Sequence, residues 1–564
     1  MSTEKIPYSV HSFMLPLRWD YLPSNYEMNL RKEQISFEER TDLKNFLKCL
    51  FQDNTKWERK FFRIDSKPEN FNEYHYFHSY ATQTIFDLQR VDEKTTANIS
   101  DSKVMVYFEL ITDPQIDTFT ITTLKDGNYK LILAGISLHV YNTGIAILTI
   151  NIENHAYENK EAVLCINEFG RRIYPQFLSQ HYPYTQAVKE TFLADSIEIT
   201  IAGMKELKDD FSEYSSIEDR EVHHYNGNKY ERSWVVKPPA YIRNLFGDTF
   251  SFIRADEKPD SIRFNILTDD RMFFQSWVGN DELSNILKEK VISKNIINDI
   301  DGKFVRLKIE TEYPYLYDPD WHAFIFGDKS TPTIENKKML SDLSAIHTYA
   351  RWAGYGTLYG FSKDSFVGIT NRSDFSAKIV THMKTMYYQM AVLSLAQRAS
   401  VLRFSAEVSN LADIARCNEN EKLIPNIKIL YKNYIEFINK IYYREITPYI
   451  QGIEMYSQFQ KIMELKENVK DLDDELNELF NYVKLEEDEK QSNEAHTLSI
   501  VATWFLPASF IASLFGIGMI TQESTTSIFR NSDMWIFWLV ICATGFLMSW
   551  IILKFFKSKR NENA

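Results

Sequence analysis

The stretch FIASLFGIGM, residues 510–519, closes a charge-free run near the end of the chain. The run extends from Thr497 to Gln522 and contains no acidic or basic side chain. A helix needs ~20 apolar residues to cross a bilayer, and two segments meet that length, the second after a short polar connection. The sequence therefore predicts a hairpin of two membrane-spanning helices at residues 498–520 and 534–556.

Basic residues set the expected orientation of this hairpin. The connection between the two segments holds one basic residue, Arg530, whereas the tail at residues 557–564 and its approach hold Lys554, Lys557, Lys559 and Arg560. Basic residues stay on the cytoplasmic side of a membrane. We therefore expect a multi-pass protein of the inner (plasma) membrane with both termini cytoplasmic. The start of the chain has no long apolar run, so a signal peptide is not expected.

An apolar seam precedes the hairpin. Its members recur at alternating spacings of three and four residues, which is the a/d pattern of a packed helix: Ile462, Leu465, Val469, Leu472, Leu476, Leu479 and Val483. The seam could face a neighbouring subunit or another helix of the same chain. Acidic residues dominate the other faces of residues 464–494, and no proline lies between Pro448 and Pro507, so one helix can run from this stalk into the first predicted span.

The rest of the chain indicates an α+β fold. Residues 103–111, 118–124, 130–140 and 144–152 are predicted strands, followed by 196–201, 261–267 and 303–310. Residues 374–446 are predicted helical, with a loop at 417–426. The expected organisation is a cytosolic α/β ligand-sensing domain (1–370), a helical bundle and stalk (371–496), the transmembrane hairpin (497–556) and a basic tail (557–564). Whether residues 1–370 form one domain or two is left open.

Composition and motifs argue against several classes of function. Hydrophobic residues make up 44% and charged residues 25%, which are globular values, and the net charge of −13 argues against direct binding of nucleic acid. No phosphate-binding loop and no Ser/His/Asp or Cys/His grouping is present, so an enzyme is not expected. Four widely separated cysteines do not suit a zinc site, and no residues for a resident metal are identified.

From about residue 427 onward the chain resembles the CorA superfamily of pentameric membrane channels. The segment LSIVATWFLPASFIASLFG resembles the first transmembrane helix of that family, including Pro507, Phe510 and Phe515–Gly516. The preceding helix resembles its stalk. The resemblance implies a homopentamer in which the first span lines the pore.

The sequence departs from the family at the end of that helix. CorA proteins carry Gly-Met-Asn there, and this chain has Gly516, Ile517 and Gly518. Magnesium holds its water shell tightly, and an asparagine ring can hydrogen-bond that shell without removing it. Without the asparagine, Mg²⁺ remains a candidate cargo, but selectivity for it is no longer implied. Contact with ions would have to come from backbone carbonyls of a loosened helix end.

Helical periodicity along the first span, read together with the resemblance, assigns the pore lining. The alternative is that these small residues serve close packing of helices. The predicted pore-lining residues are Ala495, Leu498, Ala502, Leu506, Ser509, Ser513, Gly516, Ile517 and Gly518.

Arginines beside aromatic residues in the N-terminal part are candidates for binding a phosphate and a flat ring. The alternative is that they are structural. The candidates are Arg18, Arg171, Arg172, Arg271 and Arg351.

A large unfamiliar domain before a CorA-like stalk resembles the CorA-like proteins of type III CRISPR defence systems. That resemblance implies an antiviral membrane effector opened by a nucleotide messenger, such as a conjugate of S-adenosylmethionine and AMP. The alternative is a divalent cation transporter for magnesium or cobalt. A third interpretation is a membrane-anchored binding module that conducts no ions.

Overall fold

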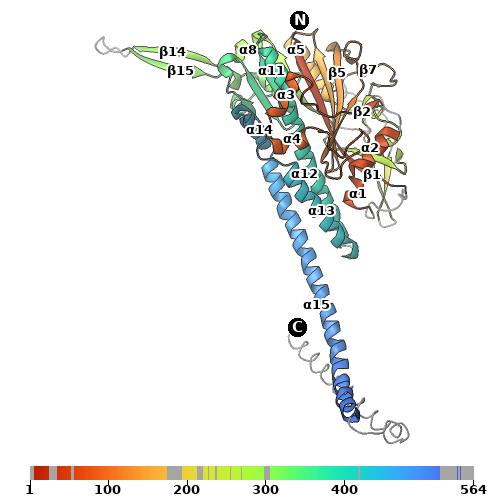
Figure 1. The fold of residues 1–564 in the computed structure, drawn as a ribbon. Coiled ribbons are helices and arrows are strands. Elements are labelled where there is room, and N and C mark those ends of the chain that lie inside the picture. The colour runs from red at the N-terminus through yellow and green to blue at the C-terminus, as the bar shows by residue number, and fades with distance from the viewer. Residues whose placement is uncertain are drawn as a thin grey trace. The chain divides into compact units, whose positions relative to one another are not determined.

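The computed structural model (Figure 1) describes most of the chain. It covers residues 6–24, 35–52, 56–174, 193–211, 220–225, 228–234, 238–253, 256–268, 270–297, 305–416 and 420–520, together with Ala543, Leu547 and Trp550. The chain divides into two compact units, residues 1–476 and 477–564.

A 14-stranded sheet organises the first unit. Its main path runs β16-β17-β18-β13-β1-β6-β5-β4-β7-β8. Two branches leave this path: β12 pairs with β1 and carries β11, and β3 pairs with β5 and carries β2. All pairs are antiparallel except β13–β18 and β11–β12. The strands are β1 (Ser9–Leu22), β2 (Trp57–Arg59), β3 (Met105–Leu110), β4 (Thr118–Thr123), β5 (Gly127–Tyr141), β6 (Ile145–Asn154), β7 (Ser196–Thr200), β8 (Lys208–Asp209), β11 (Phe250–Ser251), β12 (Ser261–Ile266), β13 (Phe273–Gly279), β16 (Thr348–Tyr349), β17 (Leu358–Ser362) and β18 (Ser365–Thr370). Two further pairs stand apart from this sheet: β9 (Arg220–Tyr225) with β10 (Asn228–Trp234), and β14 (Lys290–Ile297) with β15 (Val305–Glu312).

The strands predicted from sequence are confirmed, and the unit as a whole is α+β. The central strand β1 was missed, because both of its faces are covered and its sequence shows no simple alternation of apolar and polar residues. On one face, His11 bonds Asn167 of α5 (Lys160–Arg171) and Trp19 packs on Phe46 of α2 (Leu43–Gln52). On the other face, Asp20 pairs with Arg403 of α12 (Met386–Arg416).

Helices cover both faces of the sheet (Figure 1). The remaining helices of the first unit are α1 (Phe37–Arg40), α3 (Pro68–His75), α4 (Ser79–Ile85), α7 (Ala240–Arg243), α8 (Asp281–Leu287), α9 (Pro319–Phe326), α10 (Lys337–His347), α11 (Ser376–Lys384), α13 (Asn420–Lys440) and α14 (Ile450–Ile462), with short 3-10 turns η4 (Pro314–Leu316) and η5 (Ala353–Tyr355).

The loop predicted at residues 417–426 is wrong from Asn420 onward, and residues 417–419 lie outside the described part. Helix α13 already begins at Asn420 and includes Pro425. Pro425 stands inside the helix, where it removes the one N–H that would bond the carbonyl of residue 421, and the helix continues past it.

The predicted unbroken seam is wrong at its first step. Ile462 ends α14 and Leu465 begins α15 (Leu465–Ile520), and between them Glu464 has a positive φ of 53°. Beyond this break Leu465, Val469, Leu472 and Leu476 are all buried. The Tyr434 hydroxyl of α13 donates to the Val469 carbonyl at 3.4 Å. This part of the seam therefore packs within the chain. Val483, further along, is also buried in the single chain, and packing of the seam against a neighbouring subunit stays a prediction.

Helix α15 continues to Ile520, as the sequence predicted, and includes Gly516 and Gly518 in its backbone. Within the part of the chain that the structure describes, no helix has the length and apolar character needed to cross a membrane. The second predicted span lies outside the described residues except for Ala543, Leu547 and Trp550, and the basic tail lies wholly outside them.

Candidate ligand-binding cavity

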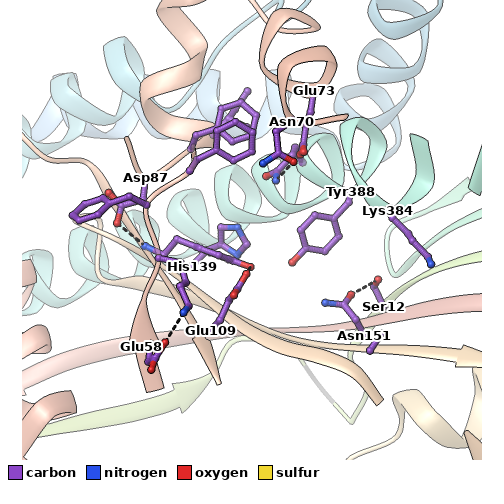
Figure 2. Close-up of a pocket in the computed structure, with 18 of the residues that line it drawn as sticks. Ser12, Glu58, Asn70, Glu73, Asp87, Glu109, His139, Asn151, Lys384 and Tyr388 are labelled. Atoms are coloured by element: carbon purple, nitrogen blue, oxygen red, sulfur yellow. Dashed lines mark hydrogen bonds and ion pairs between the residues drawn. The ribbon is translucent and has the colours of Figure 1, made fainter. Parts of the chain in front are cut away.

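A cavity of about 990 Å³ lies between the sheet and the helices α3, α11 and α12. Figure 2 shows its walls. Ser12, His139 and Asn151 come from the strands β1, β5 and β6, while Glu73 comes from α3 and Tyr388 from α12. The cavity is large enough for a small organic ligand.

One wall contains a neutral cluster of four buried charges. Arg59 contacts Asp87 at 2.9 Å and Glu93 at 3.1 Å. Lys103 completes the cluster, at 2.7 Å from Asp87 and 3.2 Å from Glu93. Buried charges are stable only when paired in this way. Arg59 and Asp87 are therefore engaged with their partners, although both line the cavity.

The rim carries paired and exposed basic groups. Lys60 pairs with Glu58, and Lys384 lies 2.5 Å from Glu153. Arg63 is exposed at the same rim. These groups can attract an anionic part of a ligand.

Glu73 is a buried carboxyl group in the helical wall. Its Oε1 accepts a hydrogen bond of 3.1 Å from Gln389. Burial raises the pKa of Glu73 to about 7, and the hydrogen bond from Gln389 opposes that rise. None of the ion pairs between described residues includes Glu73. The group therefore changes its charge near neutral pH.

Glu109 is the corresponding carboxylate of the sheet wall. It accepts a hydrogen bond of 2.9 Å from the Tyr107 hydroxyl. Tyr388 lies within electrostatic reach of both carboxylates: burial raises its pKa, and the charges of Glu109 and Glu73 raise it further. The Tyr388 hydroxyl is 3.2 Å from Ser137 Oγ.

Two buried polar atoms in the cavity wall have no hydrogen-bond partner among the described residues. They are His139 Nδ1 and Gln275 Oε1, and both side chains are 3% exposed or less. Burial lowers the pKa of His139 to about 3, so its imidazole is neutral at physiological pH. Unpartnered buried polar atoms are costly, which indicates that a bound molecule or water satisfies them.

Helix α12 links the cavity to the helices that follow it in the chain. Tyr388 and Gln389 line the cavity at its start. A little over two turns further on, Gln397 donates to the Ile441 carbonyl at 2.9 Å and to the Tyr456 hydroxyl of α14 at 2.8 Å. Phe404 then packs on Tyr434 and Phe437 of α13.

Helix α3 provides a second link. Glu73 lines the cavity, and Tyr76, which caps the same helix, stacks on Tyr449 with ring centroids 4.9 Å apart. Tyr449 caps the start of α14, and the Thr447 hydroxyl donates to the Tyr76 carbonyl at 2.5 Å. Helix α3 is therefore in direct contact with the start of α14.

Three of the predicted ligand-binding arginines lie together, away from the cavity. Arg172 and Arg271 form an isolated β-bridge, and Arg171 adjoins them. Arg172 Nε contacts Glu168 at 2.8 Å and its guanidinium also pairs with Asp270. Arg171 donates to the Gly327 carbonyl at 2.9 Å. Arg271 Nε lies 3.7 Å from Asp270 and 3.8 Å from Asp364.

The other two arginines lie elsewhere. Arg18 joins a buried network in which Asp20 and Glu407 are shared with Arg40 and Arg403. Arg351 is on the surface, 2.6 Å from Glu454. All five arginines thus have carboxylate partners in the structure, and a role in ligand binding stays a prediction for each.

The predicted pore-lining residues all lie in α15. Leu498 is 70% and Leu506 is 64% exposed, and Ala495, Ala502, Ser509 and Ser513 are exposed as well. The Ser509 hydroxyl donates to the Leu506 carbonyl at 3.0 Å. The surroundings of Gly516, Ile517 and Gly518 lie outside the described part, so pore lining stays a prediction.

Sequence reasoning missed the cavity. A signal was present: Tyr107 and Glu109 alternate with buried apolar residues in β3, so two polar side chains share one sheet face. No sequence pattern indicates that Glu73 of α3 lies opposite them. In the described ranges, no group of three or more His, Cys, Asp or Glu residues is placed to hold a metal ion.

Comparison with protein families gives one match. Residues 417–560 match the family described as CorA-like Mg2+ transporter protein. A comparison with curated proteins finds no match. The matched segment includes α13, α14 and α15, whereas the helices that line the cavity, α3, α11 and α12, precede it.

Proposed function

We propose that this chain, a member of the CorA superfamily through residues 417–560, is an oligomeric membrane channel gated by a small ligand in the cavity of its N-terminal domain. The single observation that carries the proposal is the position of α12. It lines the cavity at Tyr388 and contacts α13 and α14 of the CorA-like segment through Gln397 and Phe404.

In this proposal, gating works through the contacts of α3 and α12 with the helices α13 and α14. A ligand shifts an equilibrium only by binding one state better than the other. A ligand held between α3, α12 and the sheet favours one spacing of these elements. Because α3 stacks on the start of α14 and α12 packs on α13, that spacing biases the CorA-like helices and, through them, α15.

The exposed leucines of α15 support placement in a membrane assembly. Leu498 and Leu506 are apolar and largely exposed in the single chain, and a bilayer or neighbouring subunits would cover them. The proposed assembly is a ring of five copies in the inner membrane with both termini cytoplasmic. Native mass measurement in detergent tests the ring, and a stable monomer or dimer would contradict it.

The proposed ligand is a nucleotide messenger of antiviral defence, with the conjugate of S-adenosylmethionine and AMP as the first candidate. The size of the cavity and its mixture of aromatic, amide and charged side chains support a ligand of this kind. The test is ion flux across the membrane of proteoliposomes, reported by an ion-sensitive dye and measured with and without the conjugate. We expect flux only in its presence.

Transport of divalent cations is the second candidate function, and the name of the matched family favours it. The two functions differ in a bacterial strain that depends on an introduced magnesium transporter. Ligand-independent rescue of growth at low magnesium would favour transport, whereas absence of rescue with ligand-dependent flux in liposomes would favour the gated channel.

A further inference from the structure

We propose that the hairpin of β14 and β15 is an arm that joins the N-terminal domains of neighbouring copies of this chain. Its apolar face packs on an exposed, mainly aromatic patch of the next copy. The inference rests on the proposed ring of copies and names the surface through which their N-terminal domains touch. The patch lies on α8, α10 and the turns η4 and η5 with their caps, and its members are Ile286, Tyr313, Tyr317, Met339, Trp352 and Tyr355.

The arm has one apolar face and one charged face. Residues that stand opposite each other in an antiparallel pair share a face, and the faces alternate along each strand. The register places on one face Val291, Ser293, Asn295, Ile297, Val305, Leu307, Ile309 and Thr311. The other face carries Lys290, Ile292, Lys294, Ile296, Arg306, Lys308, Glu310 and Glu312. Val291, at the base of the apolar face, is 67% exposed.

The arm lacks the packing that such a hairpin needs. Strands β14 and β15 form a two-stranded sheet of their own, eight residues long in each strand. An isolated hairpin is marginally stable in water, because no third strand or helix covers its apolar face. Lys294 also stands directly opposite Lys308, and like charges in this arrangement destabilise a strand pair. A surface that covers the apolar face and supplies carboxylates would stabilise the arm.

The patch at the base of the arm is formed by elements that contact one another. The Ser284 hydroxyl of α8 donates to the Gly356 carbonyl after η5 at 2.8 Å, and the Glu289 N–H donates to the Ala353 carbonyl of η5 at 3.1 Å. Turn η4 in turn contacts both α8 and α10.

The size and composition of the patch suit an interface between proteins. Its six side chains are 38% to 74% exposed and so leave on the order of 700 Å² of surface in water. Each partner buries about 800 Å² in an interface of standard size, and Tyr, Trp and Met are enriched at the centre of such interfaces. Exposed apolar patches of this extent mark interaction sites.

Charge selects a second copy of this chain as the occupant. The arm carries four basic and two acidic residues, whereas the whole chain has a net charge of −13. The elements of the patch carry further exposed acidic residues, including Glu282 of α8 and Asp342 of α10. A basic arm is therefore attracted to the patch of another copy. One arm-to-patch contact, repeated head to tail, closes a ring without leaving an arm over.

Photo-cross-linking in the full-length protein tests the arm. Two differently tagged copies are co-expressed, and in one of them Leu307 is replaced by a photo-reactive phenylalanine derivative. After illumination we expect a product that carries both tags, with the linked peptide of the second copy lying within residues 281–355. The substitution Tyr355→Glu in the second copy puts a charge into the apolar contact and should lower the yield of this product at least about ten-fold.

The matched control is Leu124→Glu in the second copy. Leu124 is 88% exposed and lies outside the patch, so the yield should stay within about two-fold of the parent. Circular dichroism of each variant establishes that it is folded. Cross-links confined to the arm's own chain, to lipid or to nucleic acid would overturn the inference. Equal yields from the parent and Tyr355→Glu would also overturn it.

Native mass and flux measurements separate this inference from the proposed function. If the ring forms but the arm reacts only within its own chain, the assembly stands and the arm contact is wrong. If the arm links two copies but the conjugate opens no channel, the arm contact stands and ligand gating fails.

Discussion

Helix α15 uses the same kind of side chain in two ways. Near its start Leu472 and Leu476 are buried, and the Tyr434 hydroxyl of α13 donates to the Val469 carbonyl, three residues before Leu472. Further along, Leu498 and Leu506 keep most of their surface exposed. The difference shows that apolar spacing alone does not reveal the partner of a helix face. The first leucines stabilise the single chain, and in our proposal the second serve the assembled channel.

Removing a leucine from the buried part should have the largest effect on stability. Leu472→Ala leaves a cavity in a packed interior and should lower the free energy of unfolding by about 2–5 kcal/mol. Leu498→Ala, on the same helix, should change it by less than about 0.5 kcal/mol. Denaturant unfolding in detergent measures both. Similar losses in the two variants would show that the exposed part is also packed within the chain.

The pH dependence of stability tests the buried environment of Glu73 in the first unit. Its pKa of about 7 in the folded chain exceeds the value of about 4.3 for an unfolded glutamate. The folded state therefore binds the additional proton between these values, and the stability that Glu73 contributes falls as pH rises from about 4.3 to 7.

The substitution Glu73→Gln removes the loss of stability that ionisation of Glu73 causes as pH rises. We expect the variant to be more stable than the parent at pH 8, by on the order of 1–3 kcal/mol, with the advantage shrinking toward pH 5. Thermal unfolding at the two pH values is the measurement, and Glu58→Gln, at the exposed rim, is the control. An advantage of Glu73→Gln that does not depend on pH would contradict the assigned pKa.

A substitution at Leu506 tests the proposed pore-lining role of the exposed part of α15. Its substitution by serine should cost less than about 1 kcal/mol of stability, because the side chain is exposed in the single chain. In the assembled channel, five hydroxyl groups would replace an apolar constriction and keep it wet. We therefore expect Leu506→Ser to leak ions from liposomes without ligand and to be toxic on expression.

Leu547→Ser is the matched control, since Leu547 is similarly exposed, at 59%, and belongs to the second predicted span. It should not leak. If both variants remain as tight as the parent while correctly assembled, Leu506 does not form the gate, and the assignment of the pore face is wrong.

The smallest effect is expected at Arg351. Its only contact among the described ion pairs is with Glu454, and both groups are at the surface. Arg351→Ala should leave the unfolding temperature and the binding of the S-adenosylmethionine–AMP conjugate unchanged, because exposed ion pairs contribute little. Loss of binding would place Arg351 in the ligand site after all.

The sequence predicted the elements with strong local patterns. The strands β3 to β6 alternate or form short apolar runs, and the part of α15 before Pro507 follows from a long proline-free segment. Strand β1 was missed because helices cover both of its faces, and the break at Glu464 was missed because one residue with positive φ leaves the spacing of leucines intact. Glu73 and Glu109 line the same cavity from α3 and β3, and nothing local in either segment encodes that placement.

The arginines show the same limit. A sequence shows which residues are basic, but their carboxylate partners come from distant segments. Arg18 and Glu407 are separated by 389 positions and lie 3.1 Å apart. Only the fold reveals that each candidate arginine has such a partner.

Current recording across a planar bilayer tests the central proposal most directly. The full-length channel is inserted, and the S-adenosylmethionine–AMP conjugate is added first to one side and then to the other. Our account predicts current only when the conjugate reaches the side that carries the N-terminal domain, with no current before its addition. Steady current without the conjugate, or silence after its addition to both sides, would contradict ligand gating.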